Sequence, residues 1–160
     1  MTTQESLAGE SVGIWQDINH ISLATPDLDA TVAFYRDVLG LRVVFEAPAN
    51  PMHGRHAMLS PGGPGLGLHF FEVADAQIFG FPEGVPQTLQ FLPGALQHIA
   101  LTVSDEAAAL ALRDRLQAHG IPTTPVLTPG RNAPNVRTFL FPDPSGLLLK
   151  ATWSQTGPVG

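Results

Sequence analysis

Four of the residues whose side chains can bind a metal or carry a charge stand at repeated spacings in this sequence. His20 and His98 lie 78 residues apart, and His69 and Lys150 lie 81 residues apart. Three imidazoles that met at one point would hold a divalent ion such as Zn, Fe, Mn or Ni and leave positions open for a substrate. The ammonium of Lys150 would add a compact positive charge at the fourth corner. The spacing therefore predicts one site built from two similar halves of the chain.

Two residues are candidates for a catalytic role beside the predicted metal ligands His20, His69 and His98. Lys150 is one, because its ammonium can contact an anionic substrate group or, once neutral, act as a base. His56 is the other, because it follows Gly54 in a loop of the first half that can line the pocket. His119 falls at the end of a predicted helix, where a partial positive charge is favourable, so its role is expected to be structural.

The elements that would position these residues occur in the same order twice. In the first half, a strand at 18–24 precedes a helix capped by Thr25 or Asp27 and stopped by Gly40, and strands follow at 41–46, 56–60 and 65–73. In the second half, a strand at 96–103 precedes a helix at 105–120 that Ser104 would cap, and strands follow at 124–129, 136–141 and 146–152. We therefore expect an α+β fold of two tandem βαβββ modules whose sheets curl around a shared cavity. The modules would cover residues 17–74 and 95–153, with an inter-module connection at 75–94.

Strand alternation indicates which way the site residues face. In the two first strands, branched apolar residues occupy one face and the histidine occupies the other, and His69 shares its face with Gly67 and Phe71. The helices are expected to cover the apolar faces. The histidines and Lys150 would then project from the opposite faces into one concavity.

The composition excludes several other roles. The net charge of −6 leaves no broad basic surface, so neither nucleic acid nor an anionic membrane is expected as a partner. The chain has no cysteine, so any metal must be held by histidine and oxygen ligands. The first residues contain neither a basic n-region nor an apolar run of bilayer length, which predicts a cytoplasmic protein.

Three stretches of the sequence resemble the vicinal oxygen chelate superfamily, which includes glyoxalases, bleomycin-resistance proteins and extradiol dioxygenases. They are INHISLATPDLDATVAFYRDVLGL, LQHIALTV and FPDPSGLLLK, and the resemblance extends over residues 17 to 152. It implies paired βαβββ modules, a homodimer, and a divalent metal ion that small substrates chelate through two neighbouring oxygens. His20, His69 and His98 match three of the family's ligand positions. Lys150 stands where the family usually has a glutamate.

Two functions remain open from the sequence. Retention of three imidazoles favours a metal-dependent enzyme of the glyoxalase or dioxygenase type, with either lyase and isomerase chemistry or oxygen insertion. Loss of the fourth carboxylate favours a metal-free protein that binds or sequesters a small molecule. In that alternative, the cleft would be lined by aromatic side chains with Lys150 as the charge for an anionic ligand: Phe71, Phe79, Phe81 and Phe91.

Overall fold

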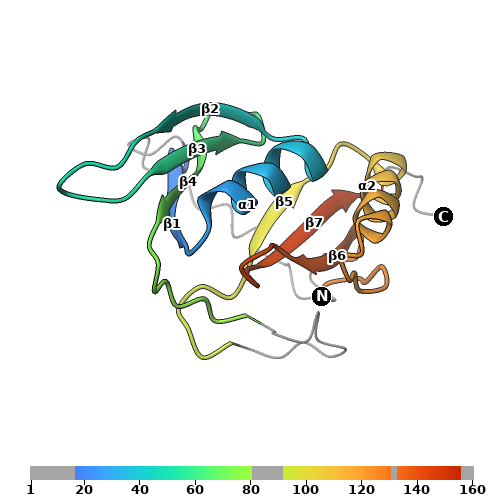
Figure 1. Cartoon of the computed structure of the whole chain (residues 1–160). Coiled ribbons are helices and arrows are strands. Elements are labelled where there is room, and N and C mark those ends of the chain that lie inside the picture. The colour runs from blue at the N-terminus through green and yellow to red at the C-terminus, as the bar shows by residue number, and fades with distance from the viewer. Residues whose placement is uncertain (1–16, 81–91, 131–132, 156–160) are drawn as a thin grey trace, which may run out of the picture.

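The computed structural model describes residues 17–80, 92–130 and 133–155, and in this part of the chain it contains two β-sheets and three helical segments (Figure 1). This α+β architecture agrees with the expected fold class. The elements in chain order are β1 (His20–Thr25), α1 (Leu28–Ala33), the π-helix η1 (Phe34–Val38), β2 (Arg42–Ala47), β3 (His56–Ser60), β4 (Gly67–Glu72), β5 (Ile99–Thr102), α2 (Glu106–Ala118), β6 (Val136–Pro142) and β7 (Leu148–Ser154).

The first sheet has the strand order β1-β4-β3-β2. β1 runs parallel to β4, with Ser22 opposite His69, and β3 runs antiparallel to β4, with His56 opposite Phe71. Residues that lie opposite each other share a sheet face, so His69, Phe71 and His56 lie on one side. Phe70 lies on the other side, against Tyr35, with ring centroids 4.9 Å apart. The histidine face therefore points away from the helical segment, as the alternation predicted.

The second sheet has three strands in the order β5-β7-β6 and repeats the same plan with one gap. The strand expected at 124–129 appears only as a bridge between Leu127 and Thr138 and as hydrogen bonds between Thr124 and Leu140. Pro125 and Pro129 explain the irregularity, because proline has no N–H group to donate to a neighbouring strand. The fourth strand of this module is thus reduced to an irregular edge.

Aspartates at equivalent positions cap the two α-helices. Asp27 accepts a hydrogen bond from the backbone of Ala30, and Asp105, 78 residues later, accepts one from Ala108. The prediction that Ser104 caps the second helix is wrong. Its hydroxyl donates instead to the Asp105 carboxylate, which reaches the free N–H groups of the first turn. Gly40 and Gly120 follow the two helices with φ angles of 77° and 71°, so both stop signals are confirmed.

Tyr35 and Asp143 form a buried contact between the modules. The Tyr35 hydroxyl donates to the Asp143 carboxylate at 3.1 Å, and Tyr35 is fully buried. Burial, followed by the charge of Asp143, raises the pKa of Tyr35, so the phenol keeps its proton and acts as the donor. The other carboxylate oxygen of Asp143 accepts from the backbone N–H groups of Ser145 and Leu147, which fixes the turn before β7.

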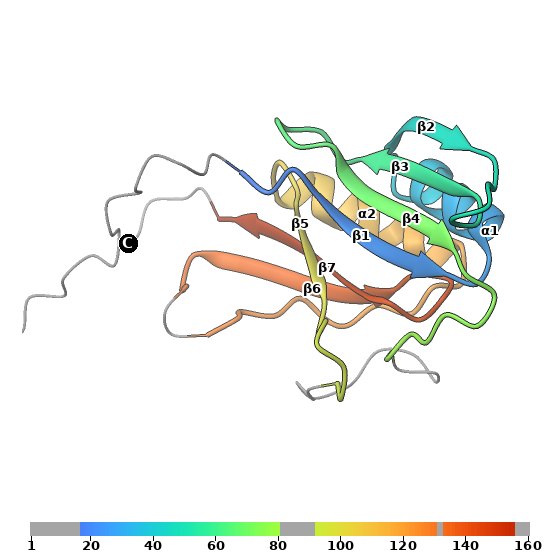
Figure 2. The ribbon, with the colours of Figure 1, turned by 90° about the vertical axis from the view of Figure 1, so that its left-hand side faces the viewer.

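The remaining inter-module contacts join residues on both sides of this pair. Thr25 contacts Ser145 through their hydroxyls at 3.1 Å, and Arg115 on α2 donates to the backbone of Val38. Buried residues of both modules form one hydrophobic cluster. Figure 2 shows the two sheets packed at an angle with α1 and α2 behind β1 and β4. The two halves of the chain therefore form one folded unit.

The described ends of the inter-module connection pack against the second module and against each other. A Cβ atom added at Gly80 would clash with the backbone carbonyl of Gly146, and one added at Gly94 would meet the ring of Phe79. These close approaches require glycine.

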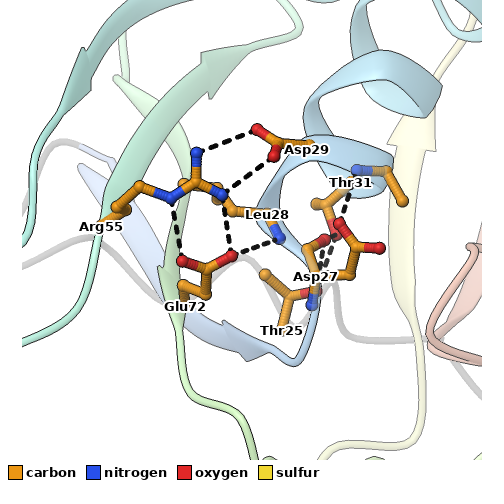
Figure 3. A network of polar contacts seen from close by, with 8 residues as sticks. Thr25, Asp27, Leu28, Asp29, Thr31, Arg55 and Glu72 are labelled. Atoms are coloured by element: carbon orange, nitrogen blue, oxygen red, sulfur yellow. Dashed lines mark hydrogen bonds and ion pairs between the residues drawn. The ribbon is translucent and has the colours of Figure 1, made fainter.

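A polar network fixes the start of α1 to the first sheet (Figure 3). The Arg55 guanidinium forms bidentate ion pairs with Glu72 and with Asp29, and Glu72 also accepts from the backbone N–H of Leu28. The hydrogen bonds from Arg55 and Leu28 lower the pKa of Glu72 to about 2. Glu72 is therefore ionised and fully engaged at the helix N-terminus.

Candidate functional site

Four histidines gather on the face of the first sheet that points away from α1, and we call His20, His53, His56 and His69 the imidazole cluster. The rings of His20 and His69 approach edge to face with centroids 5.9 Å apart. The Nδ1 of His56 lies 2.8 Å from the Nε2 of His69, within hydrogen-bonding distance. The rings of His53 and His56 are 4.6 Å apart. β1, β3, β4 and the loop before β3 together build the cluster.

The hydrogen-bond partners of His53 distinguish it from the other three members. Its Nδ1 lies 2.9 Å from the carbonyl of Gly54, and its Nε2 lies 3.0 Å from the side-chain amide of Asn50. A carbonyl can only accept and an amide nitrogen can only donate, so this ring carries its proton on Nδ1. Both nitrogens of His53 are occupied, which leaves His20, His56 and His69 as the members with nitrogens free for other partners.

Two phenylalanines surround the imidazole cluster. Phe71 stacks on His56 with an interplanar angle of 3° and lies 4.3 Å from the ring of His69. Phe45 on β2 contacts both His56 and His69 at 5.6 Å. The sequence did not indicate the role of Phe45, because a register shift between Val43 and Phe45 changes the face to which the later residues of β2 belong.

The surroundings of His69 favour its neutral form. Burial lowers the pKa of His69, and the neighbouring His56, His20 and His53 lower it further. A neutral imidazole has a lone pair available, which is the form that binds a metal or accepts a proton. The cluster therefore keeps His69 ready for either role.

The second module brings His98 and Lys150 together. Lys150 lies in the middle of β7, the central strand of its sheet, opposite Ala100 and Leu140. His98 immediately precedes β5, and alternation along that strand gives it the same face as Ala100. Burial and then the charge of Lys150 lower the pKa of His98. Lys150 therefore lies on the same sheet face as His98, and its place in a functional site stays a prediction.

The two pairs do not merge into one metal centre within a single chain. Among the described residues, no group of three or more His, Asp or Glu side chains could hold a metal ion. His20 and His69 supply two imidazoles to one region, and a third ligand is not in place there. His20 instead lines a cleft of about 470 Å³ whose opposite wall is β5, residues 99–102. The side chains of a single chain therefore supply only part of the ligand set that a metal ion needs.

Carboxylates do not complete the site. Glu72, which lies close to His69 in sequence, is held by Arg55 and the N-terminus of α1. Glu46 lies on β2 opposite Ala57, on the face opposite to His56 and Phe45. Neither carboxylate takes the place of the glutamate that the family usually has at position 150.

The aromatic residues considered for a binding cleft are distributed over different places. Phe71 belongs to the surroundings of the imidazole cluster, as described above. Phe79 is 49% exposed and lines a separate cavity of about 220 Å³ with Ala24 and Leu96. Phe81 and Phe91 lie outside the described residues.

Comparison with known proteins defines the family. The family model of the Glyoxalase/Bleomycin resistance protein/Dioxygenase superfamily matches residues 17–150, and the chain belongs to this superfamily. The match covers both modules and includes all four predicted corner residues.

Two individual proteins are also similar to this chain in sequence. The chain is 30% identical over 112 residues to the mitochondrial methylmalonyl-CoA epimerase of Mus musculus, which covers 68% of this chain and 59% of that protein. It is 34% identical over 115 residues to the ethylmalonyl-CoA/methylmalonyl-CoA epimerase of Cereibacter sphaeroides, covering 64% of this chain and 70% of that protein. This chain thus spans about three fifths of the length of the mouse relative.

A solved structure confirms the architecture. A glyoxylase/bleomycin resistance protein/dioxygenase domain from Frankia sp. EAN1pec superposes with a TM-score of 0.64 at 22% identity, covering 89% of this chain and 95% of that chain. At this identity the likeness establishes the fold alone. No helix in the described ranges has the length and hydropathy needed to cross a bilayer.

Proposed function

We propose that this chain is a metal-dependent enzyme of the glyoxalase or dioxygenase type, acting on a small substrate that chelates the ion through two neighbouring oxygens. The ion would be Zn, Fe, Mn or Ni, held by His20, His69 and His98, and when bound it would act as a Lewis acid on developing negative charge. The observation that carries the proposal is the pair His20 and His69, with ring centroids 5.9 Å apart on the face away from α1.

The other site residues have distinct roles in this proposal. His56 holds the ring of His69 through the 2.8 Å contact, and so leaves the Nδ1 of His69 free as a donor atom. Lys150 offers an ammonium to an anionic group of the substrate, next to His98. Neither role requires a carboxylate at position 150.

The missing third ligand supports a homodimer. His98 is absent from the imidazole cluster of its own chain, and the described residues supply no substitute. We propose that the second module of one chain faces the first module of its partner, so that His98 of the partner subunit completes the site. Two identical sites would then form by two-fold symmetry.

Mixing two variant subunits tests this arrangement. His20→Ala and His98→Ala should each lose the metal that copurifies with the wild-type protein at close to one ion per chain. After the two variants are unfolded and refolded together, one site in each mixed dimer contains both histidines, so about a quarter of the wild-type metal content should return. His119→Ala, at the exposed end of α2, is the matched control and should keep the metal.

Two outcomes would change the conclusion. If metal is bound but mixing restores none, the ligands come from one chain and the cleft between β1 and β5 must close. If the wild-type protein takes up no zinc, manganese, iron or nickel after dialysis, the metal-dependent enzyme is excluded. The alternative, a metal-free small-molecule binding protein of the bleomycin-resistance type, would then hold. That alternative is favoured by one observation, the ammonium of Lys150 beside His98.

A further inference from the structure

A small cavity of about 220 Å³, which we call the β1 cavity, lies beside the free edge of β1, the strand at one end of the first sheet. Residues 22–24 of β1 line it, together with residues 94–96, which lead towards β5. Residues 77–79 of the inter-module connection and Leu147 of the second module complete the lining. Complete small-molecule sites measure roughly 300–1,000 Å³, so this cavity fits part of a ligand.

The β1 cavity continues the cleft that His20 lines. That cleft, of about 470 Å³, is bounded by His20 and Ile21 on β1 and by residues 99–102 of β5. The β1 cavity is bounded by the next residues of the same strand, 22–24, and by residues that precede β5. The cleft and the cavity therefore lie one after the other along the same gap between the two modules.

The β1 cavity also adjoins the second histidine of the proposed site. Ser22, which lines the cavity, lies directly opposite His69 in the parallel pair of β1 and β4. Opposite residues of neighbouring strands share a sheet face, and such strands are about 4.8 Å apart. A small molecule bound at His20 and His69 would therefore enter the cavity with the part that extends past Ser22.

The lining of the β1 cavity favours an uncharged apolar group. Ile78, Phe79 and Leu96 are its large apolar residues, and Ser22 and Gln77 are its polar residues. No charged residue lines it in the part of the chain that the structure describes, and a charge buried without a partner is costly. Phe79 and Leu96 are both exposed in the free protein, so a ligand that covers them gains free energy by removing apolar surface from water.

From its position, lining and size we propose that the β1 cavity holds an uncharged apolar arm of the substrate, while the other end of the same molecule chelates the ion through two neighbouring oxygens. At roughly 30 Å³ for each water-sized group, the cavity has room for about seven such groups, which is the size of a benzyl group. The substrate class is then a small chelator with one short aryl or branched alkyl arm. This inference rests on the proposed function, because the metal site holds the end of the molecule that lies outside the cavity.

Calorimetric titration of the zinc-loaded protein with two hydroxamates tests the proposal, because a hydroxamate chelates a metal through two neighbouring oxygens. Phenylacetohydroxamate should bind about tenfold tighter than acetohydroxamate, the gain expected from burying roughly two methylene-sized groups. Ala24→Leu, which fills the cavity, should make the two affinities similar while the zinc content stays that of the wild-type protein. Phe79→Ala, which removes part of the lining, should also reduce the gain, and it decides alone should Ala24→Leu fail to fold. Ala118→Leu, at the exposed end of α2, is the matched control and should keep the full gain.

A metal-free probe separates this inference from the proposed function. Fluorobenzene, which resembles the arm without the chelating group, should bind weakly to chelator-treated protein, and its fluorine NMR signal should broaden with the wild-type protein but not with Ala24→Leu. Zinc uptake without any gain from the phenyl group, or a wild-type gain in both Ala24→Leu and Phe79→Ala, would overturn the inference and leave the proposed function in place. Failure to take up zinc, with the broadening intact, would overturn the proposed function and leave the cavity as an apolar binding site.

Discussion

The first module carries four imidazoles on and beside the outer face of its sheet, whereas the same face of the second module carries the imidazole of His98 and the ammonium of Lys150. The backbone plan behind these faces is the same, with aspartate caps at Asp27 and Asp105 and left-handed glycines at Gly40 and Gly120. The positions equivalent by duplication, His69 and Lys150, differ in the property that matters for a metal, since one donates a lone pair and the other repels a cation. The two modules therefore share a backbone plan, whereas the side chains on their outer sheet faces differ in chemistry.

The turns before the last strand of each module differ as well. In the second module, Asp143 fixes the turn through the N–H groups of Ser145 and Leu147 and accepts from Tyr35 of the first module. The equivalent turn of the first module contains Gly62 and Gly63, both at positive φ, and has no such carboxylate. The second module therefore supplies the carboxylate that fixes its own turn and also holds Tyr35 of the first module.

Asp143→Ala should have the largest effect among the changes that test this difference. It removes a buried acceptor and leaves the Tyr35 hydroxyl and two backbone N–H groups without partners, so we expect a loss of about 3 kcal/mol in the free energy of unfolding. Urea denaturation would measure this. Tyr35→Phe, which removes only the hydroxyl, should cost less, and equal losses in the two variants would show that the turn itself contributes nothing.

Lys150→Glu would give the second module a metal-binding side chain at the position equivalent to His69 of the first module. Replacing an ammonium by a carboxylate beside His98 removes repulsion and adds an oxygen ligand, so zinc affinity should rise about tenfold or more. Calorimetric titration of the wild-type and variant proteins with zinc gives the comparison. An unchanged or weaker affinity in the variant would mean that Lys150 lies away from the metal.

The Arg55 network makes the first module's stability depend on acid through an ion-pair network that has no counterpart among the described residues of the second module. The pKa of Glu72 is depressed to about 2 from an ordinary value of 4.5, so its stabilisation is present above pH 4.5 and is lost as the pH falls towards 2. Arg55→Gln should lower the melting temperature at pH 7 and flatten the decline between these pH values. Arg42→Gln, on the exposed edge of β2, is the control, and a decline as steep in Arg55→Gln as in the wild type would assign the acid sensitivity elsewhere.

Lys150→Gln should have the smallest effect, confined to the second module. Removing the ammonium should raise the pKa of His98 towards its ordinary value, because the charge of Lys150 is one of the two causes that lower it. The pKa of His69 should not respond, since its shift comes from burial and from the other imidazoles. Proton NMR titration of the metal-free protein resolves both histidines, and a parallel shift of the two would mean that the pairs are closer than the geometry indicates.

The repeated order of elements was predictable from the sequence because caps, glycine stops and strand alternation are local signals. The family and the α+β architecture followed from them, as did the shared face of His20 and His69. Two features were not predictable, because each depends on contacts distant in sequence. These are the bulge that brings Phe45 to the histidines and the absence of His98 from the imidazole cluster. The irregular edge at Leu127 was missed although its cause, Pro125 and Pro129, is local in the sequence. Spacing identifies equivalent positions, but the packing of the modules decides whether they meet.

The position of Lys150 in the middle of β7 has one further consequence. It is the only lysine in the sequence, so a protease specific for lysine has a single target bond, between Lys150 and Ala151. Both neighbours of β7 must release it before the strand can enter a protease cleft, because β5 and β6 hydrogen-bond to it on either side. Proteolysis of folded proteins proceeds through such local openings. The rate of cleavage after Lys150 therefore reports how often β7 separates from β5 and β6.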